Sequence, residues 1–261
     1  MTSPTSQLLT AGRNVIKQCM GVKPGESVLI VTDPARRLLA GIFETAAKEI
    51  TDKVKVVSFS GMTENAQEPP LKITERMKAA DVALLVTTYS LSHTQSRKKA
   101  CTAGCRIASM PGITREMITR TLSADYTKIA QLSTKLAQIL TGADIARLTS
   151  PAGTDLTFAL TGRKGFADTG IYTQKGNWGN LPAGEACVGP LENQTQGVLV
   201  IDDALIKIIL KDGFATTISG GKAAKNLIKT LDQVGQKARN IAELGIGTNP
   251  LAKLSPNVLE A

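Results

Sequence analysis

Four short apolar runs in the first half of the chain restrict its fold more than any other feature. They cover residues 28–31, 54–59, 82–87 and 106–110, and each is rich in aliphatic side chains. Mostly apolar runs of this length are typical of strands buried on both faces of a parallel sheet. The segments between them carry apolar residues at helical spacing. This alternation predicts an α/β fold, with a doubly wound parallel sheet and flanking helices.

The helices of this first half are bounded by recognisable signals. They are expected at residues 8–20, 34–50, 71–80, 94–103 and 125–141. Asp33 is the expected cap of the second helix, with Pro34 at its first position. Ligands of such sheets bind beyond the carboxyl ends of the strands, so Asp33 and the loop at 89–96 would lie on the functional edge. Neither the dinucleotide nor the P-loop glycine pattern follows the first strand.

The second half of the chain has a different pattern. Apolar and polar residues alternate at 145–172, 154–158, 197–202 and 205–210, with glycines between them, which indicates antiparallel strands. Lys-Asp-Gly at 211–213 is a hairpin signal. A helix from 222 to about 242 would then deliver Glu243 at its end. We therefore predict two domains, an α/β domain at 1–142 and a β-rich α+β domain at 143–261.

Composition excludes several classes of function. The net charge of +9 comes from basic residues that are spread thinly and have no interleaved aromatic residues, so nucleic acid is not an expected partner. No apolar run is long enough for a membrane span, and a cytoplasmic protein is expected. The four cysteines lack a disulfide or zinc spacing and are expected to be small buried thiols, although Cys101 and Cys105 could form a metal pair on a helix.

The only histidine, His93, precedes a predicted helix. A single histidine in such a loop is more often a helix cap or a structural hydrogen-bonding residue than a ligand. It also leaves no His-pair metal site, and neither Ser92 nor Ser96 stands in a Gly-x-Ser-x-Gly elbow. A serine hydrolase is therefore not expected.

A loop at 176–185 contains the only Trp and ends in a carboxylate, Glu185. Its Gly, Pro and Asn residues permit or fix unusual backbone angles, which is typical of a loop shaped around a ligand. A hard cation or an amine would suit the carboxylate. The alternative is a tight turn with a solvated Glu.

Three motifs of the second half follow one another in a set order: Asn-Leu-Pro-Ala-Gly-Glu at 180–185, Gly-Pro-Leu-Glu at 189–192 and Glu-Leu-Gly-Ile-Gly-Thr-Asn-Pro at 243–250. In this order they resemble the signatures of the thermophilic, M29-type metallo-aminopeptidases. The resemblance spans nearly the whole chain and includes the segments at 22–26 and 110–114. It implies a leucyl aminopeptidase-like hydrolase, a metalloprotease that removes N-terminal residues from peptides by a two-metal mechanism.

The same resemblance implies the metal ligands. By motif, Glu185 and Glu243 each hold one of two divalent ions, Zn, Co, Mg or Mn, and the protein forms a homodimer. The resemblance names no catalytic or substrate-binding residue for this chain. The family's histidine-bearing segment would follow Pro250, so we expect a chain that is incomplete at its C-terminus, with little turnover as given.

Two other functions fit the same residues. Ring-cleaving dioxygenases of the 2,5-dihydroxypyridine type resemble the same fold and bind a single iron, and the first-half segments do not separate them from the peptidases. A non-catalytic relative that binds a peptide or an amine around Glu185 is the third possibility.

Overall fold

The computed structural model describes residues 4–201, 205–255, 257 and 259, and it divides into two compact units. Unit 1 comprises Met1–Leu132, Asp168–Gly184 and Thr248–Ala261, and unit 2 comprises Ser133–Ala167 and Glu185–Gly247. The sequence predicted a single boundary at 142 and 143. The chain instead passes between the units several times, so each unit is built from separate segments. No helix in the described part of the chain has the length and apolar character that a bilayer span requires.

Unit 1 is built on the predicted parallel sheet, whose strand order is β2-β1-β3-β4-β8. The strands are β1 (Val28–Thr32), β2 (Val54–Ser58), β3 (Val82–Val86), β4 (Arg106–Ser109) and β8 (Trp178–Asn180). All four pairings are parallel. The first four strands confirm the sequence prediction. The fifth, β8, was missed because it comes from the glycine-rich loop segment, which has no apolar run.

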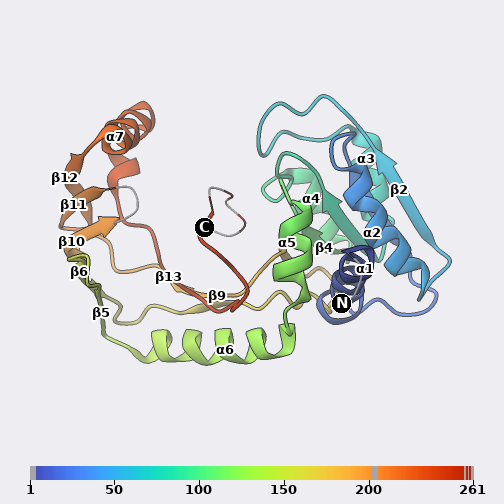
Figure 1. Cartoon of the computed structure of the whole chain (residues 1–261), viewed down its shortest axis with the longest axis horizontal. Helices are drawn as coiled ribbons and strands as arrows, with labels where there is room; N and C mark the ends of the chain where they lie inside the picture. The colour runs from blue at the N-terminus through green and yellow to red at the C-terminus, as the bar shows by residue number, and fades with distance from the viewer. Residues whose placement is uncertain (1–3, 202–204, 256, 258, 260–261) are drawn as a thin grey trace. The chain divides into compact units, whose positions relative to one another are not determined.

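Helices cover both faces of this sheet (Figure 1). They are α1 (Pro4–Asn14), a π-helical turn η1 (Val15–Cys19), α2 (Arg37–Lys48), α3 (Leu71–Lys78), α4 (Gln95–Thr102), α5 (Arg115–Arg120), a 3-10 turn η2 (Thr121–Ser123) and α6 (Tyr126–Gly142), which continues into unit 2. Alternate strand residues serve the two faces, because successive side chains of a strand point in opposite directions. Ile30 and Leu84 pack with α1 and α2, whereas Leu85 packs with α3 and α4.

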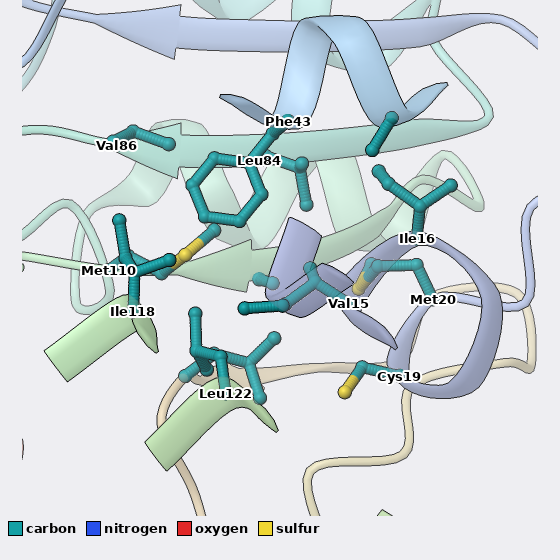
Figure 2. Close-up of a cluster of buried hydrophobic side chains, with 14 of the residues drawn as sticks. Val15, Ile16, Cys19, Met20, Phe43, Leu84, Val86, Met110, Ile118 and Leu122 are labelled. Atoms are coloured by element: carbon teal, nitrogen blue, oxygen red, sulfur yellow. The ribbon is translucent and has the colours of Figure 1, made fainter. Parts of the chain in front are cut away.

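The core on the first of these faces is mainly aliphatic, with a few aromatic side chains such as Phe43. Figure 2 shows Val15, Ile16, Phe43, Leu84 and Met110 converging from helices and strands. Each is fully buried. Burial of one such side chain contributes about 1.5–3 kcal/mol to folding, so this cluster is a main source of the stability of unit 1.

The predicted start of the second helix is wrong. The helix α2 begins at Arg37, and residues 34–36 form a turn. Asp33 accepts hydrogen bonds from the backbone N–H groups of Arg36 and of Thr88, which follows β3. Asp33 therefore ties together the carboxyl ends of β1 and β3, where the strand order reverses, and does not cap a helix.

Unit 2 contains a five-stranded antiparallel sheet, with the order β12-β11-β10-β6-β5. Its strands are β5 (Ile145–Thr149), β6 (Asp155–Ala159), β10 (Gln196–Ile201), β11 (Ile206–Lys211) and β12 (Phe214–Gly220). Residue 202 of the predicted strand at 197–202 lies outside the described residues. The predicted hairpin turn joins β11 to β12, and β11 alternates strictly between buried and exposed residues. The β-rich second half is thus confirmed.

The last helix ends earlier than predicted. The helix α7 (Lys222–Val234) lies beside β12 and ends at Gly235, whose φ of 102° is accessible mainly to glycine (Figure 1). A short 3-10 turn, η3 (Gln236–Arg239), follows. Glu243 is therefore not delivered by a helix end. It directly precedes β13 (Leu244–Gly247), in a three-stranded sheet of order β13-β9-β7, with β9 at Glu185–Val188 and β7 at Phe166–Asp168.

Candidate metal centre

The antiparallel pairing of β9 with β13 brings the two predicted ligands together. The two strands lie side by side (Figure 1), and in their register Glu185 lies opposite Gly247 and Cys187 opposite Gly245. Directly opposed residues of such a pair project from the same face of the sheet. The alternate residues of β9, Ala186 and Val188, pack into the core of unit 2. Glu185 and Cys187 therefore project from the other face of the sheet. The residues of β13 opposite them, Gly247 and Gly245, have no side chains on that face.

Glu243 completes a group of three potential ligands. One ligand atom each from Glu185, Cys187 and Glu243 lies within 4.8 Å of the other two. Glu243 is exposed, Glu185 is half-buried, and Cys187 is only 8% exposed. Carboxylate oxygens and a thiolate sulfur at this separation can bind one divalent cation from one side. The metal-ligand roles of Glu185 and Glu243 remain predictions, now with a geometry that suits them.

The position of the Glu185 carboxylate requires a residue without a side chain at position 245. A Cβ atom at residue 245 would lie 2.1 Å from Glu185 Oε1, whereas a Cβ atom at Gly247 would meet no atom within 4 Å. The first glycine of the Gly-Ile-Gly motif thus leaves room for the carboxylate to lie over β13. This observation gives a physical reason for one residue of the motif and supports the site as a built feature.

The loop that leads into β9 is fixed by the residues that follow β13. Thr248 donates its backbone N–H to Gly184 O at 2.8 Å, and the Asn249 side chain donates to Ala183 O at 3.2 Å. The Leu181–Pro182 peptide in this loop is cis. The two motifs therefore bind each other, and they hold the adjacent ends of β9 and β13 together.

Trp178 and His93 belong to a different cluster, in unit 1. The Arg97 guanidinium lies 3.6 Å from the centroid of the Trp178 ring, and His93 meets that ring edge-on with centroids 6.2 Å apart. His93 does not cap α4. The N-cap is Thr94, whose hydroxyl accepts a hydrogen bond from the backbone N–H of Arg97. His93 is exposed. The Trp-containing part of the loop therefore stabilises β8 and α4 and contributes no ligand to the group of three.

Asp168 is half-buried and lies beside the Tyr172 hydroxyl. The Tyr172 hydroxyl lies 2.8 Å from Asn180 O and 3.0 Å from Asp168 Oδ1. The hydrogen bonds that Asp168 accepts from the Tyr172 hydroxyl and from the Gly170 backbone favour its charged form, but burial outweighs them. Burial raises the pKa of Asp168 above its usual value. The Tyr172 hydroxyl thus links Asp168 to Asn180, the first residue of the Asn-Leu-Pro motif.

We expect Asp168→Asn to flatten the pH dependence of stability. A carboxyl group whose folded pKa is raised contributes stability that is present below its unfolded pKa and is lost as pH rises through the folded pKa. The amide can still hydrogen-bond to Tyr172 but does not titrate. Urea unfolding from about pH 4 to about pH 8 should therefore show a variant at least as stable as the wild type at the upper end. A variant that is less stable at every pH would contradict a raised pKa of Asp168.

The control for this change is Asp155→Asn, because Asp155 has the opposite environment. Its carboxylate accepts two hydrogen bonds from Arg147, which lower the pKa of Asp155. Stability from a lowered pKa is present above the unfolded pKa and is lost as pH falls through the folded pKa. Asp155→Asn should therefore lower stability at neutral pH and not raise it.

Sequence reasoning missed Cys187, which it placed among the small structural thiols. The signal was present, because Glu185 and Cys187 are two residues apart in a strand and must share one face. Cys101 and Cys105 do not form part of any group of three metal-ligand residues within the described ranges. Cys105 is buried and Cys101 is half-buried.

Comparison with known proteins separates the two enzyme classes that the motifs left open. A family model described as NicX, 2,5-dihydroxypyridine 5,6-dioxygenase, matches residues 7–259. The structure of 2,5-dihydroxypyridine dioxygenase from Pseudomonas putida KT2440 matches with a TM-score of 0.78 and 22% identity, over 97% of this chain and 79% of that chain. Wild-type AmpT from Thermus thermophilus matches with a TM-score of 0.67 and 15% identity, over 94% and 79%. No curated protein gives a significant match.

The expected aminopeptidase assignment is wrong, and with it the terms hydrolase, protease and metalloprotease. Both structural matches support the fold. The family model covers nearly all of the sequence and names an oxidoreductase. The chain therefore belongs to the NicX family of 2,5-dihydroxypyridine 5,6-dioxygenases.

Proposed function

We propose that this protein is an iron-dependent dioxygenase that opens the ring of a 2,5-dihydroxypyridine. The observation that carries the proposal is the family match over residues 7–259. The fold likeness to a dioxygenase of this name, at a TM-score of 0.78, is consistent with it. The dioxygenase, which the sequence analysis gave as an alternative to the aminopeptidase, thereby becomes the main proposal.

The three grouped residues suit a first-row divalent ion. Glu185 and Glu243 offer carboxylate oxygens and Cys187 offers sulfur, and Gly245 leaves the space in which the Glu185 carboxylate lies. We propose that these side chains hold one iron ion. The set differs from the two-histidine-one-carboxylate group that is typical of non-haem iron oxygenases. His93, the only histidine of the sequence, belongs to unit 1.

In this role each part of the site has a separate task. Iron supplies redox chemistry that amino-acid side chains lack. The two carboxylates balance the charge of a divalent ion, and the short β9–β13 ladder holds them in place. The hydrogen bonds from Thr248 and Asn249 to the loop before β9 fix the ends of that ladder. Glu243 itself is exposed to solvent.

An oxygen-consumption assay tests the proposal. We expect the purified protein, loaded anaerobically with Fe(II), to consume oxygen and 2,5-dihydroxypyridine in equal amounts. The same protein loaded with Co(II) or Zn(II) should not hydrolyse Leu-p-nitroanilide. Oxygen uptake that does not depend on added iron, or turnover of the anilide alone, would overturn the proposal. Iron binding without any turnover would leave a non-catalytic binding protein.

The homodimer is a further proposal, and it rests on family resemblance alone. Static light scattering of the purified protein measures it directly. We expect a mass near twice the chain mass of 27.5 kDa.

A further inference from the structure

The carboxyl edge of the parallel sheet in unit 1 holds two neighbouring polar side chains with unused hydrogen-bonding capacity. Ser109 ends β4, and it lies in register with Asn180, which ends β8. Ser109 is also in register with Leu85, which packs with α3 and α4. Side chains in register on neighbouring parallel strands project from the same face. Ser109 and Asn180 therefore share one face, at the edge where ligands of such sheets bind.

The Ser109 hydroxyl is fully buried and has no hydrogen-bond partner among the described residues. Native proteins usually satisfy a buried hydroxyl, if not with a protein group then with a bound water or a ligand, because an unpaired one costs free energy. Thr87, which follows the neighbouring strand β3, is equally buried but donates its hydroxyl to Tyr89 O at 2.6 Å. The hydroxyl at the end of β4 thus remains open to a partner from outside the chain.

The Asn180 amide is held in place and keeps a free donor. Its Oδ1 accepts a hydrogen bond from the Ser92 hydroxyl at 2.8 Å, and its backbone carbonyl lies 2.8 Å from the Tyr172 hydroxyl. These contacts fix the residue through its side chain and its backbone. The Nδ2 group bonds to no residue in the described part of the chain. Because Asn180 is half-buried, this oriented donor is within reach of a ligand.

We propose that Asn180 and Ser109 bind the lactam edge of the substrate ring, which is the C=O and the adjacent ring N–H of the 2-pyridone form of a 2-hydroxypyridine. The Asn180 amide donates to the carbonyl oxygen, and the Ser109 hydroxyl accepts from the ring N–H. Both protein groups are neutral, as the lactam is. Neighbouring strands lie about 4.7–4.9 Å apart, so the two side chains can reach adjacent atoms of one ring.

The inference rests on the proposed function for the identity of the ring. Asn180 begins the Asn-Leu-Pro-Ala-Gly-Glu motif that ends at Glu185, a proposed iron ligand, so one motif would serve both the substrate and the metal. The pair also makes the site selective. A ring without the N–H leaves the buried Ser109 hydroxyl unpaired, and a site built to hydrogen-bond a substrate group discriminates against analogues that lack it.

Titration of the purified protein with 2-pyridone tests the site without turnover. The chain has one Trp, Trp178, which lies two residues before Asn180 on the same face of β8, so its single indole N–H signal in nitrogen-15 NMR reports binding. We expect saturable binding of 2-pyridone and at least about 10-fold weaker binding of N-methyl-2-pyridone, which lacks the N–H.

Two variants assign this binding to the two side chains. Ser109→Ala should weaken 2-pyridone binding by about 3–10-fold and abolish the preference over N-methyl-2-pyridone. Asn180→Asp keeps an oxygen that accepts from Ser92 but replaces the free donor with an acceptor, which faces the carbonyl of the ligand. It should weaken binding by at least about 10-fold.

The matched control is Ser96→Ala. Ser96 is buried in α4, but its hydroxyl bonds to Glu68 and Thr74. Its removal should lower the melting temperature and leave the affinity for 2-pyridone unchanged. Ser109→Ala should show the opposite pattern, with a melting temperature equal to or above that of the wild type, because it removes an unpaired buried hydroxyl.

Unchanged affinity in folded Ser109→Ala would mean that the hydroxyl binds only water, and it would overturn the inference. So would equal affinities of the wild type for the two pyridones, or no binding of either, a result that needs no variant. Oxygen uptake is a separate readout. The expected pyridone pattern without oxygen uptake would sink the proposed dioxygenase and keep this site. Oxygen uptake with an unchanged KM for 2,5-dihydroxypyridine in both variants would do the reverse.

Discussion

Glu185→Gln and Glu243→Gln should each abolish metal-dependent activity while the fold persists. The amide keeps the shape of the side chain but removes the negative charge that a divalent ion requires from its ligands. We expect metal affinity to fall by at least about 100-fold in each variant. Glu243 is exposed, so its replacement should change the free energy of unfolding by no more than about 0.5 kcal/mol.

The control for these two variants is Glu192→Gln. Glu192 also lies in a quoted motif and is exposed, but it forms an ion pair with Arg163 and lies outside the group of three. It should bind metal as the wild type does. Isothermal titration with Fe(II) or Co(II), together with thermal unfolding, separates the outcomes. Wild-type affinity in Glu185→Gln and Glu243→Gln would show that these carboxylates are not ligands.

The sheet of unit 1 could be predicted from sequence because its signal is local. The runs at β1 and β3 are apolar at every position, and all five residues of each strand are buried. Such a run has one stable environment, between two layers of helices. The strand β8 lacked this signal. It pairs with β4 through Trp178, Gly179 and Asn180, and its place at the sheet edge depends on tertiary contacts.

The candidate site was only partly predictable, for a related reason. The convergence of Glu185 and Glu243 depends on the pairing of β9 with β13, which are far apart in sequence. Only the resemblance to a known family suggested it. Cys187 was overlooked because single cysteines are commonly buried for packing, although its place two residues after Glu185 already put both on one face. The predicted helix at 222 to about 242 was too long because it ran through Gly235, whose φ of 102° ends α7 at Val234.

The choice between peptidase and dioxygenase lay beyond what the residues of the motifs could decide. The backbone of the two motifs shapes a ladder that presents carboxylates, and such a ladder can serve unrelated reactions. The hydrogen bonds from Thr248 and Asn249 to the loop before β9 fix that ladder, whatever chemistry takes place there. The resemblance of the motifs therefore predicted the fold but not the reaction. The reaction class followed only from the family match over residues 7–259.

Gly245→Ala should disable the site by moving a single side chain. The added Cβ atom would lie 2.1 Å from Glu185 Oε1, and a contact that short forces one of the two groups to move. The carboxylate is the end of a flexible side chain, so it moves and the strand stays. The backbone of residue 245 lies outside the left-handed region, so alanine is compatible with it. We expect a folded variant whose metal affinity is lower by about 10–100-fold.

Gly247→Ala is the matched control for this change. It adds the same methyl group to the same strand two residues later, where a Cβ atom meets nothing within 4 Å. Both substitutions reduce the freedom of the unfolded chain by the same amount, worth about 0.4–1 kcal/mol of added stability where the native backbone accepts alanine. The two variants should therefore have similar melting temperatures but different metal affinities. Equal affinities, or the unfolding of Gly245→Ala alone, would mean that Gly245 serves the strand and not the Glu185 carboxylate.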